Sequence, residues 1–215
     1  MATVHLKKLR KAHGPVARLL NKTRPLATFF GQFVKHPAMI GSIIPSSPSL
    51  VASMLKTVDW SSTRLFVEYG PGVGTFTRTI LEKMRSDALL IAIDINTDFV
   101  RYLSADIADH RFRAVHGSAV DVRRIISEHG FSEADYILSG LPFSTLPAGV
   151  GDAITTETHA ALRPGGSFLV YQYSGFVQRF LVPNFADVET DVEWFNIPPC
   201  RLFRAKKAES LAQAA

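Results

Sequence analysis

Short apolar runs alternate with amphipathic stretches from residue 64 to residue 173. The runs predict strands at 64–69, 89–94, 112–116, 135–139 and 167–173. The stretches between them predict helices at 73–84, 97–107, 120–128 and 150–161. Continuous apolar strands separated by helices are typical of a parallel sheet that is covered on both faces. This part of the chain is therefore predicted to form an α/β domain.

The segment "DVETDVEWFNIPPCRLFRAKK", residues 187–207, departs from this alternation. It holds two strand-like runs joined only by a short turn at Pro198 and Pro199. Such a turn is too short for the crossover helix that parallel strands require, so the two strands are expected to pair antiparallel. Five parallel strands followed by such a hairpin resemble the Rossmann-like, seven-stranded sheet of class I methyltransferases.

The first 36 residues show a different pattern. They read as helical pieces interrupted at Gly14-Pro15 and Arg24-Pro25, and each proline suits the first turn of the next piece. One piece carries an apolar stripe at helical spacing, formed by Leu26, Phe29, Phe30, Phe33 and Val34. The stripe suits either packing as a lid on the sheet or direct contact with lipid.

A loop with the sequence "GSIIPSSPSL", residues 41–50, follows these helical pieces. Within it, Ser47 is suited to cap a helix that Pro48 begins and that runs to about Val58. We therefore expect two parts: a basic amphipathic helical arm with its loop at residues 1–47, and a methyltransferase-like α/β domain at residues 48–215.

Charge is distributed unevenly along the chain. Nine Lys or Arg residues precede the first acidic residue, Asp59, so residues 1–58 carry a formal charge of +9. The other 15 Lys or Arg are outnumbered by the 19 acids, which leaves −4 on residues 59–215. A basic arm of this kind favours a polyanionic partner, either nucleic acid or an anionic lipid surface.

Composition narrows the class of protein. A 47% share of apolar residues and 20% of charged ones, over 215 residues, fits a soluble globular domain with an added arm. The single cysteine, Cys200, excludes an internal disulfide and suits a reducing cytoplasm. No apolar stretch reaches the roughly 18 residues that a membrane-spanning helix needs. A cytoplasmic location is therefore expected.

Three glycines follow the first strand in the stretch "LFVEYGPGVGTF", residues 65–76. Gly70, Gly72 and Gly74 let the backbone approach a ligand with no Cβ in the way, at the strand end where ligands of such sheets bind. The dinucleotide pattern G-x-G-x-x-G would need glycine where this chain has Thr75. The simple alternative is a glycine turn without a ligand.

Two acids favour one ligand over the others. Asp94 closes the second strand, where its carboxylate can accept hydrogen bonds from both hydroxyls of a ribose. Glu68 can approach an ammonium group, directly or through water. This arrangement fits S-adenosylmethionine, a cation with no phosphate, better than NAD. The Ser46-Ser47 pair then suits either a helix cap or closure over the methionine end of the cofactor.

The third strand ends in "VHGSAVD", which places Ser118 and Ala119 where methyltransferases contact the adenine. The serine stands where an acid is usual, so either its hydroxyl or the Asp121 carboxylate would accept from the adenine amino group. The full predicted cofactor site comprises Glu68, Tyr69, Gly70, Gly72, Thr75, Asp94, Ile95, Ser118, Ala119 and Ser139.

The fourth strand ends in "SGLPF", residues 139–143, where the transferred methyl would meet its acceptor. This motif is similar to the Asn-Leu-Pro-Tyr/Phe motif of ribosomal RNA adenine dimethyltransferases, in which the asparagine holds a flipped base. This chain has Gly140 in place of the asparagine. Those enzymes also carry a helical RNA-binding domain after the sheet, where only about ten residues remain here. Both differences count against RNA as the acceptor.

Five stretches together resemble bacterial phospholipid N-methyltransferases and their ornithine-lipid relatives: "GSIIPSSPSL" (41–50), "VEYGPGVGTFT" (67–77), "SGLPFSTLP" (139–147), "LRPGGSFLVYQYS" (162–174) and "NIPPCRLFR" (196–204). The resemblance implies methylation of the head-group amine of phosphatidylethanolamine and its methylated intermediates, towards phosphatidylcholine, or of ornithine lipid. It further implies peripheral attachment to the inner face of the cell membrane through residues 1–36, with no nucleic-acid partner.

Aromatic residues at the strand ends complete the predicted site. Tyr173 matches the tyrosine that the family carries after the fifth strand, and the resemblance assigns it a catalytic role. Phe143, Tyr171 and Tyr173 are expected to contact the substrate, because aromatic faces stabilise the methylated cations that form. Core packing is the alternative for each ring. No general base or metal cluster is expected, and a protein that binds S-adenosylmethionine or lipid without catalysis stays open.

Overall fold

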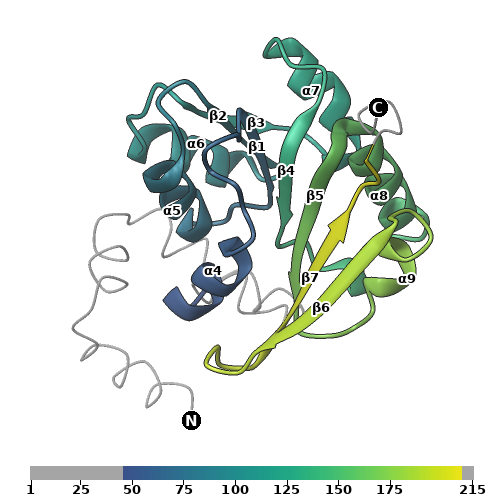
Figure 1. Cartoon of the computed structure of the whole chain (residues 1–215). Coiled ribbons are helices and arrows are strands. Elements are labelled where there is room, and N and C mark those ends of the chain that lie inside the picture. Colours follow the sequence, from purple (N-terminus) through teal and green to yellow (C-terminus); the bar gives the residue numbers. More distant parts are fainter. Residues whose placement is uncertain (1–45, 210–215) are drawn as a thin grey trace, which may run out of the picture. The chain divides into compact units, whose positions relative to one another are not determined.

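Seven strands form one mixed sheet in the computed structural model, which describes residues 46–209. Their spatial order is β3-β2-β1-β4-β5-β7-β6 (Figure 1). The strands are β1 Leu65–Tyr69, β2 Leu89–Asp94, β3 Phe112–His116, β4 Ala134–Ser139, β5 Leu162–Gln172, β6 Asp187–Glu193 and β7 Cys200–Lys206. The first five run parallel, and β7 pairs antiparallel with both β5 and β6. The predicted parallel sheet with a C-terminal antiparallel hairpin is therefore confirmed.

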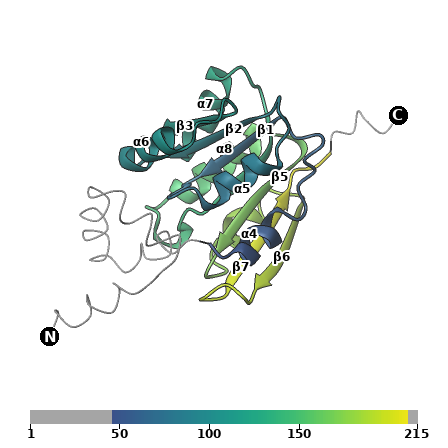
Figure 2. The ribbon, with the colours of Figure 1, turned by 90° about the vertical axis from the view of Figure 1, so that its left-hand side faces the viewer.

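Helices cover both faces of this sheet (Figure 2). They are α4 Pro48–Leu55, α5 Thr75–Lys83, α6 Thr97–Asp106, α7 Val122–Glu128, α8 Val150–Ala161 and α9 Gln178–Leu181, with 3-10 turns η3 Ala119–Asp121 and η4 Phe143–Thr145. Successive side chains of a strand point to opposite faces. In β1, Phe66 packs with residues of α4, α5 and α6, whereas Leu65, Val67 and Tyr69 pack with residues of α7, α8 and α9. Each face thus has its own buried apolar layer.

Several predicted boundaries agree with the structure, and β5 shows why one does not. The bounds of β2, β3 and α8 are those predicted from the sequence. Strand β5 begins at Leu162, five residues earlier than predicted, and its pairing with β4 shifts register between Ala134 and Tyr136. Arg163 Nε donates to Asp135 Oδ1 at 2.7 Å and holds this irregular start against β4.

The N-terminal boundary of the described region lies at the start of α4. The Leu50 N–H donates to Ser47 Oγ at 3.1 Å, so Ser47 caps the helix as predicted. Apart from Ser46 and Ser47, the predicted arm of residues 1–47 lies outside the described residues, together with its apolar stripe. Within residues 46–209, no helix is long and apolar enough to cross a membrane.

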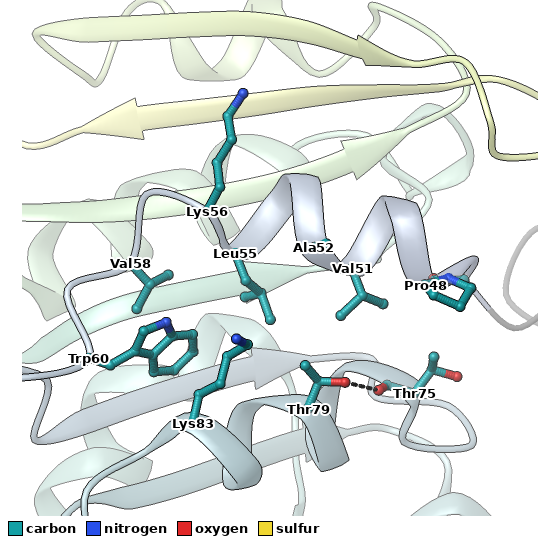
Figure 3. A pocket seen from close by; sticks show the side chains of 11 residues that line it. Pro48, Val51, Ala52, Leu55, Lys56, Val58, Trp60, Thr75, Thr79 and Lys83 are labelled. Atoms are coloured by element: carbon teal, nitrogen blue, oxygen red, sulfur yellow. Dashed lines mark hydrogen bonds between the residues drawn. The ribbon is translucent and has the colours of Figure 1, made fainter.

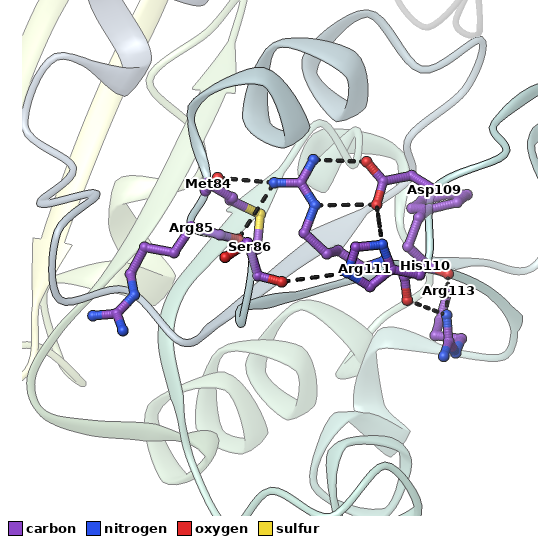
Figure 4. Close-up of polar contacts among 8 residues, drawn as sticks. Met84, Arg85, Ser86, Asp109, His110, Arg111 and Arg113 are labelled. Carbon is purple, nitrogen blue, oxygen red and sulfur yellow. Dashed lines mark hydrogen bonds and ion pairs between the residues drawn. The ribbon is translucent and has the colours of Figure 1, made fainter.

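A cluster of hydrogen-bonded polar groups lies at the amino ends of β2 and β3 (Figure 4). Arg111 donates to both carboxylate oxygens of Asp109, at 3.0 and 2.7 Å, and to the Met84 carbonyl at 2.8 Å. These bonds connect the residue that follows α5 to the turn that precedes β3. Hydrogen bonds from Arg111 hold the pKa of Asp109 at about 2. The cluster therefore lies at the amino ends of the strands, whereas the glycine loop follows the carboxyl end of β1.

Candidate functional site

The loop after β1 is built from glycines in left-handed conformations. Gly70, Gly72 and Gly74 have φ angles of 64°, 56° and 80°, which L side chains rarely adopt. A Cβ on Gly70 would lie 3.1 Å from Leu141 Cδ2, so the loop also packs closely against the loop after β4. The sequence therefore leaves bare backbone at the carboxyl end of the central strand, beside the first turn of α5.

A buried carboxyl group lies next to this loop. The Glu68 side chain is 3% exposed, and its Oε2 accepts a hydrogen bond from Thr77 Oγ1 at 2.6 Å. Burial raises the pKa of Glu68 to about 7, and the nearby Asp94 carboxylate contributes to the rise. Thr77, on the inner face of α5, was not predicted from sequence as part of the site. A cation beside Glu68 would favour its ionised form.

Asp94 lies at the end of β2 with its carboxylate turned back towards the glycine loop. Oδ1 accepts from the Asn96 N–H at 2.8 Å, and the carboxylate also accepts from the Gly72 backbone. Partial burial raises the pKa of Asp94 against these two bonds. A carboxylate has about four acceptor positions, so capacity for ligand hydroxyls is left. Ile95, the next residue, is 75% exposed.

The other predicted cofactor residues occupy the same sheet edge in different environments. Ser118 Oγ caps η3 by accepting from the Val120 N–H at 3.4 Å. Ala119 is buried, and its side chain packs in the core. Ser139 is fully buried, with its hydroxyl accepting from the Leu141 N–H at 3.2 Å. Thr75 is the first residue of α5, directly after the glycines.

Two predicted site residues face away from this edge. The Tyr69 side chain is fully buried on the α8 side of the sheet, where its hydroxyl lies 3.1 Å from Thr158 Oγ1. Strand alternation places it on the face opposite Glu68, so only its backbone can reach a ligand beyond β1. Phe143 is 1% exposed and packs against Phe180, with ring centroids 5.7 Å apart. The core covers this ring in the structure, and its contact with a substrate cation stays a prediction.

Tyr171 fills the space beside Gly140. A Cβ on Gly140 would lie 2.2 Å from the Tyr171 hydroxyl oxygen and 2.7 Å from Cζ, so any side chain there would displace the ring. The ring stacks on Phe76 of α5 with centroids 4.9 Å apart, and the Ser46 side chain hydrogen-bonds its hydroxyl. Burial and the nearby Glu68 raise the pKa of Tyr171. This tyrosine therefore stands between the loop after β4 and the first turn of α5.

Asn196 connects three distant parts of the sequence at the same edge. Its Oδ1 accepts from the Ser47 N–H at 3.2 Å, and its Nδ2 donates to the Pro198 carbonyl at 2.8 Å. Its side chain also hydrogen-bonds Tyr173, whose side chain is 45% exposed just beyond β5. In the sequence, the Asn-Ile-Pro-Pro motif contributes only to the family resemblance. A buried, fully engaged amide in an otherwise exposed turn is the physical reason for an asparagine at this position.

A pocket of about 480 Å³ opens between α4 and α5 (Figure 3). Val51 and Leu55 of α4 line it with Trp60, and Lys56 and Lys83 contribute charged side chains. Ser46 and Thr75 also belong to its lining, which connects the pocket to the glycine-loop end of α5. The predicted cofactor site is thus continuous with this partly apolar pocket on the α4 side of the sheet.

Comparison with known proteins identifies the family. No family model matches the chain. An ornithine lipid N-methyltransferase from Singulisphaera acidiphila is 31% identical over 177 residues, which cover 80% of this chain and 90% of that protein. This chain belongs to that lipid N-methyltransferase family. The predicted family resemblance is confirmed, and the protein is an N-methyltransferase that uses S-adenosylmethionine.

Solved structures confirm the class I methyltransferase fold of this N-methyltransferase. The N-methyltransferase NodS from Bradyrhizobium japonicum, in complex with S-adenosyl-L-homocysteine, superposes with a TM-score of 0.59 at 15% identity, covering 76% of this chain and 89% of that one. TrmN from Thermus thermophilus gives 0.58 at 20% identity over 74% of this chain. Our chain covers only 48% of the longer TrmN chain, so this second likeness concerns the shared sheet.

The residues at the carboxyl ends of the parallel strands suit this cofactor. When bound, S-adenosylmethionine supplies an electrophilic methyl group on a sulfonium centre. Glu68 offers a buried carboxyl that can face the positively charged end of the cofactor, and Asp94 offers acceptor positions for hydroxyl groups. The glycines let the cofactor approach the backbone closely. Among residues 46–209, no three His, Cys, Asp or Glu side chains are grouped so that they could hold a metal ion.

Proposed function

We propose that this N-methyltransferase methylates the head-group amine of membrane aminolipids, either phosphatidylethanolamine and its methylated intermediates, towards phosphatidylcholine, or ornithine lipid. The observation that carries the proposal is the half-exposed Tyr173, held by Asn196 beside the cofactor edge. The Singulisphaera acidiphila relative is an ornithine lipid N-methyltransferase, which supports a lipid acceptor.

An RNA base is the less favoured acceptor because of Gly140. The base-holding asparagine of RNA adenine dimethyltransferases would stand at this position. Here the Tyr171 ring occupies the space in which such a side chain begins, since even a Cβ would lie 2.2 Å from its hydroxyl oxygen. Tyr171 therefore puts an aromatic ring where an amide would hold the base amino group, and such a ring suits the methylated cation that forms on an aminolipid better than a neutral base.

Each side chain has a role in this proposal that its position permits. Asp94 holds the ribose hydroxyls, Glu68 faces the ammonium group, and Ser118 contacts the adenine. Tyr173 positions the attacking amine, which must be neutral at attack, through its ring and its hydroxyl oxygen. Alignment of donor and acceptor and exclusion of water supply most of the rate enhancement in such a displacement. The closely packed Tyr171, Phe76 and Leu141 provide that dry environment.

Labelled S-adenosylmethionine tests the proposed acceptor directly. Purified full-length protein is incubated with vesicles that contain phosphatidylethanolamine, with vesicles that contain ornithine lipid, and with ribosomal RNA. Label is expected in one or both lipids and not in RNA. Label in RNA alone would replace the proposal by an RNA methyltransferase. Saturable cofactor binding without transfer to any acceptor would favour a protein that binds the cofactor without catalysis.

We further propose that the basic arm, residues 1–36, holds the protein on the anionic inner face of the cell membrane. Eight of the nine Lys or Arg residues that precede Asp59 lie in this arm, which holds no acid, and each basic residue near an anionic bilayer contributes about 1 kcal/mol. Sedimentation of full-length protein with anionic vesicles, compared with a chain lacking residues 1–22, measures this contribution. Equal binding by both proteins would exclude the arm as the anchor.

Tyr173→Ala is expected to lower the rate of transfer to lipid by at least tenfold while cofactor affinity changes less than threefold. The reason is that Tyr173 is placed at the acceptor side, beyond β5, away from Asp94 and Glu68. Tyr173→Phe keeps the ring and loses the hydroxyl, so it separates cation stabilisation from hydrogen bonding. Steady-state kinetics and calorimetry on both variants provide the measurement. Full activity in both would show that the ring only packs.

The raised pKa of Glu68 predicts a pH dependence of cofactor binding. A carboxyl with a pKa of about 7 is largely protonated at pH 6 and ionised at pH 8. Because a cationic ligand prefers the carboxylate, affinity for S-adenosylmethionine is expected to rise from pH 6 to pH 8 and then level off. Titration calorimetry in buffers of different ionisation enthalpy also detects the proton released on binding. A flat profile would separate Glu68 from the ligand.

Glu68→Gln is the matched control for this dependence. In the wild type, the folded-state pKa of Glu68 lies above its value in an unfolded chain. The free energy of unfolding therefore falls as the pH rises through about 7 and Glu68 ionises in its buried position. The glutamine variant is therefore expected to lose cofactor affinity and its pH dependence, yet to melt at a higher temperature than the wild type at pH 8 in the absence of ligand.

A further inference from the structure

The turn between β6 and β7 exposes large apolar side chains to solvent. Trp194 is 71% exposed, Phe195 84% and Ile197 85%. Two further exposed residues, Pro198 and Pro199, complete the turn. Exposed apolar side chains that are grouped, rather than scattered singly, mark interaction sites. We call residues 194–199 the hairpin tip.

The hairpin tip lies at the same sheet edge as the acceptor site. Strand β7 runs antiparallel to β5, and Arg201, near its start, pairs with Gln172 at the end of β5. The turn that precedes β7 is therefore next to the residues that follow β5, including Tyr173. In Figure 1 this turn is the yellow-green loop at the lower end of the sheet, below α4 and β7.

Asn196 fixes the tip to the acceptor site rather than leaving it loose. It is 4% exposed, although both of its neighbours in the chain are largely exposed. Its side chain bonds Tyr173, Ser47 and the tip's own Pro198, so the exposed rings and the acceptor tyrosine are held on one support. Whatever binds the tip is thereby placed at a fixed position relative to Tyr173.

The charges around the tip suit a lipid surface. Residues 194–199 carry no charge. The acid that precedes them, Glu193, is turned inward, where its carboxylate accepts from Ser53 Oγ at 2.5 Å and from the Phe195 N–H at 3.0 Å. The residue after Cys200 is the exposed Arg201. An uncharged, aromatic tip with a cation at its base matches a bilayer surface, where Trp rings lie at head-group depth and cations meet phosphates.

We infer that the hairpin tip inserts into the head-group layer of a bilayer and sets Tyr173 at the depth of the lipid amine. This inference rests on the proposed function, since it assigns a source for the lipid acceptor. The acceptor of such an enzyme is held in the membrane, so the site must meet the surface at a fixed depth. The tip provides this contact independently of residues 1–36.

Trp194 fluorescence tests insertion directly. Trp60→Phe leaves Trp194 as the only tryptophan of the full-length chain. Its emission is expected to shift to the blue when anionic vesicles of phosphatidylglycerol and phosphatidylethanolamine are added, and bromine atoms on the upper acyl chain should quench it. Protein that sediments with the vesicles while Trp194 emission stays unshifted would overturn the inference. An emission that is already blue-shifted without vesicles, or that shifts with protein concentration alone, would indicate another occupant and also overturn it.

Phe195→Asp and Ile197→Asp test the consequence for transfer. Both side chains are exposed, so these changes leave the fold intact. Transfer to vesicle lipid is expected to fall roughly tenfold, because an acid in the interface is costly. Ala186→Asp is the matched control, since it adds the same charge to an exposed residue before β6, at the other end of the hairpin. Vesicle transfer at the wild-type rate in both tip variants would overturn the inference.

A monomeric short-chain aminolipid separates this inference from the proposed function. Tip variants are expected to methylate it at the wild-type rate, because no bilayer is involved. If wild-type protein methylates neither the short-chain lipid nor vesicle lipid, the proposed function fails. If the wild type methylates both the short-chain lipid and the vesicle lipid, and the tip variants lose both activities equally, the tip affects methyl transfer itself and not membrane contact. That result would overturn the insertion inference and leave the proposed function standing.

Discussion

Replacing Asp94 with alanine is expected to weaken S-adenosylmethionine binding by at least tenfold while the fold stays intact. The carboxylate is fixed at the end of β2 by the Asn96 N–H at 2.8 Å and by the Gly72 backbone. Each hydrogen bond to a charged group contributes about 1.5–3 kcal/mol, and about 1.4 kcal/mol corresponds to tenfold in affinity. Loss of one ribose contact is therefore enough for the predicted effect, which titration calorimetry measures.

Asp87→Ala is the control for this experiment. Asp87 precedes the same strand at its other end, where it forms an exposed ion pair with Arg85 at 2.7 Å. Its replacement should leave cofactor affinity unchanged, because an exposed pair contributes little and lies far from the glycine loop. Unchanged affinity in Asp94→Ala as well would end the assignment of the ribose contact.

Gly140→Ala is expected to lower methyl transfer on the order of 100-fold, the loss that a misplacement of about 1 Å near the reacting centre can cause. The added methyl would lie 2.2 Å from the Tyr171 hydroxyl oxygen. The ring cannot move freely, because it stacks on Phe76 and hydrogen-bonds Ser46. Gly175→Ala is the control at the same edge, where a Cβ would make an ordinary contact of 3.4 Å with Gln178.

A double variant distinguishes this clash from general damage to the loop. In a Tyr171→Ala background the ring is absent, so adding Gly140→Ala should cause little further loss. The double-mutant cycle on the transfer rate then shows strong coupling between the two positions. If the two losses multiply instead, the glycine is required for a reason other than the tyrosine. Circular dichroism of all three variants checks that each one folds.

The order and type of the elements followed from hydrophobic patterning because both faces of this sheet are buried. A continuous apolar run such as "LLIAID" is typical of a strand that is buried on both faces, and the bounds of β2 and β3 were predicted correctly. The start of β5 was not, since Pro164, Gly165 and Gly166 read locally as a turn. The Asp135–Arg163 contact that draws them into the strand is formed by residues 28 positions apart.

Side-chain orientation was harder to predict than position at the sheet edge. The site contains Glu68 and Tyr69 as neighbours, yet strand alternation allows only one of them to face the ligand. The sequence does not say which face carries the cofactor. The burial of Phe143 was not predicted for a related reason: the segment after β4 turns inward on a 3-10 helix, which places this ring in the core.

Asn196 illustrates a contact that only the folded chain reveals. Ser47 and Asn196 are 149 positions apart, and no periodicity links them. A short polar side chain in an apolar turn is a weak signal by itself, since asparagine is common in turns for local reasons. Its role depends on β7 returning antiparallel beside β5, which brings the turn to Tyr173.

The polar cluster of Asp109, Arg111 and the Met84 carbonyl lies at the amino ends of β2 and β3, at the opposite end of the strands from the glycine loop. Stabilising substitutions for structural or biotechnological work can therefore be sought around it without disturbing the acceptor. The loops after β4 and β5, at the other edge, can be diversified in libraries that select for new amines. A scaffold arranged in this way lets durability and substrate range be engineered in separate rounds.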